Sequence, residues 1–142
     1  MSDIVTRLAS REDLPRIKEI AVASPWTKHV THISYCHSGR FDNGEVTVAE
    51  VNGAIVGFVI AHRRRQTHDV KIDMISVSAD AGRSGVGRAL VESLGGETLV
   101  LNVAKENAVA QAFYARVGFA RRGESRDGTC WVMRRRGWRT LF

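Results

Sequence analysis

Apolar and polar residues along the chain follow two periods, which predict a mixture of strands and helices. In the first half, alternation predicts three strands: Ile4–Leu8, Gly44–Val51 and Ala54–His62. Asn52-Gly53, between the last two apolar runs, is a strong signal for a two-residue hairpin turn. Helical spacing after Ser10, a suitable N-cap, predicts a helix that ends at Ser24-Pro25.

The second half of the chain continues this pattern. Its predicted strands are Asp69–Ser78, Leu99–Val103, Phe119–Gly123 and Thr129–Arg134. A glycine-rich turn follows the first of them, and apolar residues then recur at helical spacing from Val86 to Leu94. Another helix begins at Asn107, a good N-cap, and stops at Gly118. We expect its apolar face to pack on the sheet through Val109, Phe113 and Val117.

Length and composition indicate one globular domain. We expect it to span residues 1–142 and to end in a basic tail, 134–142. The chain holds no apolar run long enough to cross a membrane, and its N-terminus lacks the apolar core of a signal peptide, so we expect a cytoplasmic protein. Cys36 and Cys130 are too few for a disulfide framework and are expected to stay reduced.

The charge of the chain is strongly positive, with a formal net charge of +6 and a pI near 10.0. Its arginines gather at Arg63–Arg65, Arg121-Arg122 and Arg134–Arg136, which could form a basic stripe. Positive charge attracts acidic partners but does not by itself identify nucleic acid as one. Because no binding motif with interleaved aromatic residues accompanies the arginines, nucleic acid is not the expected partner.

Potential metal ligands occur in the stretch Trp26–Arg40, which is compatible with a further helix. There His29, His32 and Cys36 are spaced to share one helical face, and Zn²⁺ accepts imidazole and thiolate ligands. No second cluster completes a tetrahedral set, so we expect no metal site.

The stretch Asp69–Arg88 is the part of the sequence most typical of a binding site. A strand passes through a glycine-rich turn into a helix N-terminus, where unpaired backbone N–H groups and the helix dipole favour an anion such as phosphate. The turn fits neither the dinucleotide-binding pattern nor the P-loop pattern. The segment GRSGVG instead resembles the pyrophosphate loop of the GCN5-related N-acetyltransferases (GNAT), Q/R-x-x-G-x-G/A, with Gly85 and Gly87 on the two small positions. The first position departs from the pattern, because Gly82 stands there and the arginine is displaced to Arg83.

A second segment strengthens this resemblance. NAVAQAFYARVGF, from Asn107 to Phe119, matches the family's signature N-x-x-A-x-x-F-Y-x-x-x-G-F at every named position. The likeness covers about Val46 to Arg135. It implies an α/β (α+β) fold: a single domain with a central mixed, mostly antiparallel twisted sheet of six to seven strands, about four flanking helices, and a V-shaped splay between the fourth and fifth strands.

The resemblance also implies acetyl-CoA as cosubstrate, with its pantetheine arm hydrogen-bonded to the fourth strand in the manner of an added strand. The residues implied to contact the coenzyme are Ile75, Ser76, Val77, Gly82, Arg83, Ser84, Gly85, Val86, Gly87, Arg88, Asn107 and Phe113. The implied catalytic residues are Tyr114, a phenol that protonates the departing thiolate, and Asp73, a base for the attacking amine. Asp69, His62 and Glu45 compete with Asp73 for the role of base, and a structural salt bridge is an alternative for Asp73 itself.

We therefore expect an N-acetyltransferase that moves an acetyl group to a primary amine of a small molecule or peptide. Two alternatives remain open: a non-catalytic acyl-CoA-binding module, and an acetyltransferase that acts on an RNA-linked amine. The sequence does not name the acceptor amine. The tail 134–142 is compatible with docking on the domain, with exposure to solvent and with a homodimer contact.

Overall fold

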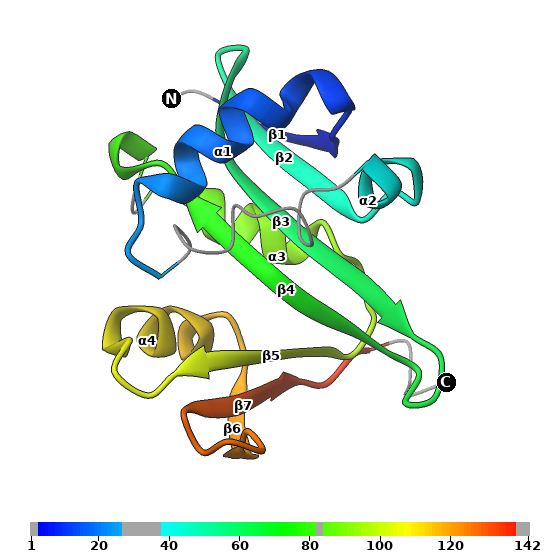
Figure 1. Cartoon of the computed structure of the whole chain (residues 1–142), viewed down its shortest axis with the longest axis vertical. Coiled ribbons are helices and arrows are strands. Elements are labelled where there is room, and N and C mark those ends of the chain that lie inside the picture. Colours follow the sequence, from blue (N-terminus) through cyan, green and yellow to red (C-terminus); the bar gives the residue numbers. More distant parts are fainter. Residues whose placement is uncertain (1–2, 27–37, 82–83, 139–142) are drawn as a thin grey trace. The chain divides into compact units, whose positions relative to one another are not determined.

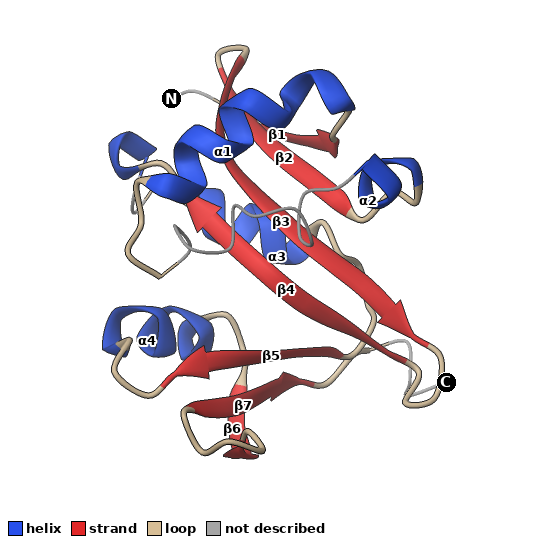
Figure 2. Ribbon diagram, viewed as in Figure 1, coloured by secondary structure: helices blue, strands red, loops and turns tan. Residues whose placement is uncertain are grey.

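The computed structural model describes residues 3–26, 38–81 and 84–138. Its helices are α1 (Leu14–Val22), α2 (Ser38–Asp42), α3 (Val86–Glu92) and α4 (Ala108–Arg116). Its strands are β1 (Ile4–Leu8), β2 (Val46–Val51), β3 (Ala54–Arg64), β4 (Asp69–Val77), β5 (Leu99–Ala104), β6 (Ala120–Glu124) and β7 (Cys130–Arg135). The strands pair in the order β1-β2-β3-β4-β5-β7-β6. Figure 1 labels these elements, and Figure 2 colours them by type.

The sheet is mixed and mostly antiparallel, which confirms the expected fold class. Antiparallel pairing joins β1 to β2, β2 to β3, β5 to β7 and β6 to β7, whereas β4 and β5 run parallel. The parallel register comprises two pairs, Val70 with Leu99 and Lys71 with Val100. The two strands therefore share hydrogen bonds only near their first residues, which is the local feature that the predicted splay requires.

Contacts divide the chain into two compact units, which we describe separately. The first comprises Met1–Ala61 and Met74–Leu94, and its core joins α1 and α2 to one face of β2, β3 and the end of β4. The buried side chains of this core are Ala9, Ile17, Ile20, Ala21, Phe41, Val46, Val48, Phe58, Ile60 and Met74. Figure 1 shows α1 and α3 on opposite sides of these strands.

Close contact between α3 and β3 depends on a glycine. A Cβ atom on Gly57 would lie 3.0 Å from Val86 Cγ1, 3.1 Å from the Ser76 carbonyl oxygen and 3.2 Å from Leu90 Cδ1. These separations are tighter than ordinary carbon contacts, so α3 lies on β3 at the one place where the strand carries no side chain.

The second unit comprises His62–Asp73 and Gly95–Phe142, and it contains β5, β6, β7 and α4. The Asn107 side chain caps α4 by accepting a hydrogen bond from the Ala110 N–H at 3.1 Å, as its sequence position predicts. Gly118 follows the end of the helix, and its φ of +102° suits glycine. Gln111 fastens the helix to the end of β5 by donating to the carbonyl oxygens of Ala104 and Lys105, at 3.0 and 2.9 Å.

Most predicted elements of the chain are confirmed. Asn52 and Gly53 take φ angles of +53° and +80°, as a two-residue hairpin turn of the predicted kind requires. The predicted helix after Ser10 starts with a short 3₁₀ segment, Arg11–Asp13, and continues as α1. Strand β3 extends to Arg64, two residues beyond the predicted end at His62, and so includes part of the basic run Arg63–Arg65. Among the described residues, no helix is long and apolar enough to cross a membrane.

The segment after β7 packs against the start of β5 through a second close glycine contact. The Gly137 N–H donates to Thr98 Oγ1 at 3.0 Å in a buried position. A Cβ atom on Gly137 would collide with the backbone of Gly96, Glu97 and Thr98. Backbone atoms cannot rotate away as a side chain can, so this contact requires glycine.

We predict that Gly137→Ala destabilises the protein by about 1–3 kcal/mol, the usual cost of overpacking a close contact. Gly123→Ala is the matched control, because a Cβ atom on Gly123 would meet open space. Urea unfolding of the wild type and both variants measures the difference. Equal midpoints for Gly137→Ala and the wild type would contradict the contact.

Candidate active site

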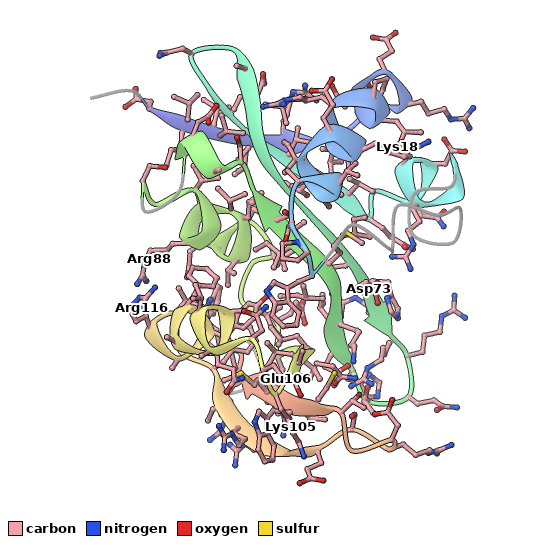
Figure 3. The ribbon with its side chains drawn as sticks, turned by 60° about the vertical axis from the view of Figure 1, so that its left-hand side comes forward. Lys18, Asp73, Arg88, Lys105, Glu106 and Arg116 are labelled. Atoms are coloured by element: carbon pink, nitrogen blue, oxygen red, sulfur yellow. The ribbon has the colours of Figure 1, made fainter. Side chains whose placement is uncertain are left out.

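A histidine and a carboxylate meet on the neighbouring strands β3 and β4. His62 Nδ1 lies 2.7 Å from Asp73 Oδ2, a distance typical of a strong hydrogen bond. The Asp73 side chain is 12% exposed and that of His62 is 36% exposed, so the pair is shielded on the aspartate side and reaches solvent on the histidine side. Figure 3 labels Asp73 on β4.

This contact favours one tautomer of the neutral imidazole ring. An ionised Asp73 carboxylate only accepts hydrogen bonds, so Nδ1 carries the hydrogen. In the neutral ring, Nε2 then has a free lone pair and can accept a proton. The pair has the arrangement of a general base held in one tautomer by a carboxylate.

The other candidate bases have structural partners. Asp69 is buried and accepts two hydrogen bonds from Arg64, both at 2.7 Å, and one from Thr67 Oγ1 at 2.8 Å. The Arg64 guanidinium beside Asp69 lowers the pKa of this carboxyl. Glu45 belongs to the first unit, and its Oε1 atom lies 3.5 Å from Nη1 of Arg40. Of the four candidates for the base, the structure therefore brings together Asp73 and His62, which were expected to be alternatives to each other.

Tyr114 is a buried residue of α4, 8% exposed. Its ring packs against Phe113 and Phe119, with centroid distances of 5.3 and 5.5 Å. Burial raises the pKa of the Tyr114 phenol, so the hydroxyl keeps its proton throughout the neutral range and can act as a hydrogen-bond donor.

The predicted packing face of α4 is wrong at one position. Val109 is 82% exposed, whereas Tyr114 and Val117 are buried. The buried side of the helix is therefore rotated toward the tyrosine, because the ring contact with Phe119, just beyond the helix, draws Tyr114 inward. Phe113 is half-buried beside it.

At the end of β4, backbone groups of alternate residues point in opposite directions. The Ser78 N–H donates to the Val56 carbonyl at 2.7 Å, so even-numbered residues here direct their backbone groups toward β3. By alternation, the N–H and C=O groups of Ile75 and Val77 point away from β3, while those of Ser76 point toward it. Ile75 and Val77 are half-buried and Ser76 is buried.

The glycine-rich turn leads into α3 as predicted. Gly85 precedes the helix with a φ of +91°, which suits glycine, and its carbonyl accepts the N–H of Ala89 at 3.0 Å. The first N–H groups of a helix have no acceptor within it, and here they belong to Val86, Gly87 and Arg88. Ser84 is exposed just before them, whereas Gly82 and Arg83 lie outside the described residues.

Metal ligands do not gather in the part of the chain that the structure describes, where no group of three or more His, Cys, Asp and Glu side chains could hold an ion. The stretch with His29, His32 and Cys36 lies outside the described residues.

Comparisons with known proteins agree with these motifs. Residues 42–121 match the family model of the acetyltransferase (GNAT) domain. The 5-NmdU N-acetyltransferase of Pseudomonas phage PaMx11 is 33% identical over 130 residues, which cover 88% of this chain and 93% of the phage protein.

Solved structures show the same fold. The PaiA N-acetyltransferase from Thermoplasma acidophilum, solved in complex with coenzyme A, has a TM-score of 0.78 at 17% identity, covering 94% of this chain and 99% of that one. The ribosomal-protein-S18-alanine N-acetyltransferase from Escherichia coli has a TM-score of 0.65 at 25% identity, covering 94% of this chain and 93% of that one.

We predict that Asp69→Asn lowers stability at neutral pH by about 1–3 kcal/mol, because it breaks a charged pair that keeps some access to water. The lowered pKa of Asp69 means that its contribution is complete above the unfolded-state pKa of about 4 and is lost as the pH falls below it. The stability curves of the wild type and the variant should therefore converge in acid. Urea unfolding across this pH range measures them. Arg64→Gln breaks the same ion pair and should give the same convergence. If the stability curves of the wild type and the variants stay parallel across this pH range, the stabilising role of the Asp69–Arg64 pair is contradicted.

Proposed function

Because this chain belongs to the family of GNAT acetyltransferases, we propose that it moves an acetyl group from acetyl-CoA to a primary amine by direct attack in a ternary complex. The whole chain, residues 1–142, acts as one acetyltransferase domain. The observation that carries the proposal is the hydrogen bond between His62 and Asp73, because an attacking amine must lose a proton and this pair can accept one.

The coenzyme is held by backbone groups. Ile75 and Val77 direct theirs away from β3, where a pantetheine arm can bind in the manner of an extra strand. The N–H groups at the start of α3 bind the pyrophosphate, together with residues 82–85. Asn107, which caps α4, and Phe113 are assigned to coenzyme binding by the resemblance of their segment to the family's signature.

His62 and Asp73 divide the role of the base. The amine nitrogen attacks the thioester carbonyl carbon, and its proton passes to Nε2 of His62. Asp73 holds the ring in the required tautomer and stabilises the imidazolium that forms. This assignment changes the expectation that Asp73 alone is the base, because the His62 side chain is the more exposed of the two and is therefore more accessible to an amine.

Tyr114 acts on the departing sulfur. As the carbon–sulfur bond breaks, the electron pair goes to sulfur, and the Tyr114 hydroxyl donates a hydrogen bond and then its proton to the thiolate. Burial keeps the phenol neutral before that moment. The hydroxyl is needed mainly in the transition state, so it contributes more to turnover than to coenzyme binding.

The acceptor amine is suggested by the relative from phage PaMx11, which acts on 5-NmdU. In this abbreviation dU is the standard symbol for deoxyuridine, so the first acceptor to test is an amine carried by a nucleoside. This acceptor resembles the alternative of an RNA-linked amine in carrying the amine on a nucleoside, but its sugar is deoxyribose in place of ribose. A non-catalytic acyl-CoA binder would bind acetyl-CoA without releasing thiol in the presence of any acceptor.

We predict that the protein releases CoA thiol when acetyl-CoA and 5-NmdU are both present, and that Tyr114→Phe reduces this turnover at least tenfold. The variant keeps the ring contacts and removes only the proton donor, whose contribution is usually about a hundred- to ten-thousand-fold. Thiol release measures turnover, while calorimetry with acetyl-CoA and thermal unfolding serve as controls and should change little. Unchanged turnover would make Tyr114 a packing residue, and lost affinity would make it a binding group.

A second prediction tests each member of the base pair. Asp73→Asn should lower kcat/KM by about a hundredfold or more, because an amide that donates to Nδ1 forces the hydrogen onto Nε2. His62→Ala should lower kcat/KM to a similar extent, because it removes the imidazole that accepts the proton of the amine. Gln66→Ala, at an exposed residue of the turn between β3 and β4, is the control and should keep the wild-type kcat/KM. A His62→Ala variant with the wild-type kcat/KM would exclude His62 as the base.

A further inference from the structure

Three arginine side chains of the second unit line one pocket. Arg122 comes from β6, Arg134 from β7 and Arg136 from the residue after β7 ends. The pocket has a volume of about 410 Å³, and Thr67, His68 and Thr98 complete its lining. These residues belong to four separate segments, so the arginines meet through the fold and not through their order in the sequence.

Irregular features of the strands bring these side chains together. The register of β6 with β7 shifts between Arg121 and Gly123, which leaves Arg122 as the extra residue of a β-bulge. A bulge breaks the alternation of side chains and re-aims the extra one. Arg134 and Arg136 are two residues apart, which places them on the same side of an extended segment. Arg136 is held there by the close contact of Gly137 with Thr98.

Carboxylates near the pocket already have cationic partners. Asp69 is paired with Arg64 at 2.7 Å, and Glu97 is paired with Arg63 at 2.9 Å. Within residues 3–26, 38–81 and 84–138, no ion pair engages Arg122, Arg134 or Arg136. The pocket therefore keeps the positive charge of three guanidinium groups.

Several other cationic side chains of this unit have partners within the protein. Arg121 lies over the Trp131 ring at 4.0 Å, and Lys105 lies 4.4 Å from the same ring and 3.0 Å from Glu124. The basic stripe expected from the sequence is thus divided: Arg63, Arg64 and Arg121 have partners within the protein, whereas the pocket arginines face an open space.

We propose that this pocket binds backbone phosphates of a nucleic acid that carries the acceptor amine. The inference rests on the proposed function, because it identifies the acceptor of that reaction. Guanidinium groups present paired N–H donors that match phosphate oxygens. The pocket shares no residue with the proposed pyrophosphate site at Gly82–Arg88, so the coenzyme's pyrophosphate does not account for it.

The first test measures binding of a fluorescein-labelled duplex DNA by anisotropy at several salt concentrations. Arg122→Gln, Arg134→Gln and Arg136→Gln should each weaken binding several-fold and reduce the slope of log K against log salt by about one, the effect of losing one phosphate contact. Arg126→Gln is the matched control, because it removes the same charge from an exposed residue of the β6–β7 turn that does not line the pocket. It should retain the wild-type slope. Thermal unfolding confirms that each variant is folded.

The second test separates this inference from the proposed function. The pocket variants should acetylate free 5-NmdU at the wild-type rate and lose activity only on 5-NmdU within DNA. Equal DNA binding by the wild type, the pocket variants and the control would overturn the inference, whatever happens to acetyl transfer. A polyglutamate peptide that binds as tightly, with the same dependence on the arginines, would also overturn it. Arginine-dependent DNA binding without any acetyl transfer by the wild type would uphold the pocket and overturn the proposed function.

Discussion

The arrangement of the site depends on a simple constraint: a carboxylate placed in a half-buried strand must have a partner. β4 carries two such groups, Asp69 and Asp73, and each meets a cationic or titratable side chain of β3. The pairs also specify how the two strands align, because a slip by one residue would move both partners away. The residue type of the partner then decides the role of each carboxylate. Arg64 is always charged and makes Asp69 structural, whereas His62 can gain or lose a proton, which is the reason for proposing that Asp73 takes part in proton transfer.

Local signals in the sequence were sufficient for most of the fold. Asn52-Gly53 and Asn107 act through their own backbone or the next few residues, so their effects can be read without knowing the rest of the structure. The packing face of α4 could not be predicted from local signals alone. Val109 fits an apolar face by spacing, but Phe119, beyond the end of the helix, decides which side is buried. A contact with a residue outside the helix cannot be found from helical periodicity.

In the candidate site, too, features encoded in one continuous segment could be predicted, whereas contacts between separate segments could not. The motif positions around Gly85 and Tyr114 could be recognised because the chemistry is encoded in a continuous segment. The hydrogen bond between His62 and Asp73 joins two strands. The sequence alone does not show that these two residues meet, so each is a separate candidate for the base. The arginine pocket was harder still, since it depends on a bulge that adds one residue to β6. Nothing in the sequence around Arg122 distinguishes it from Arg121, although one lies in the pocket and the other lies over Trp131.

Gly57 has a consequence for how this protein can vary over evolutionary time. The residue lies in a strand far from the glycine-rich turn in sequence, yet its missing side chain sets the distance at which Val86, the first residue of α3, rests on the sheet. Any larger residue at position 57 would displace the start of the helix, and with it the backbone N–H groups that begin there. Natural sequence drift at this position should therefore be limited by the helix and by β4 together, because smaller residues at positions 86 and 90 would relieve two of the close contacts of an alanine but not the one with the Ser76 carbonyl oxygen.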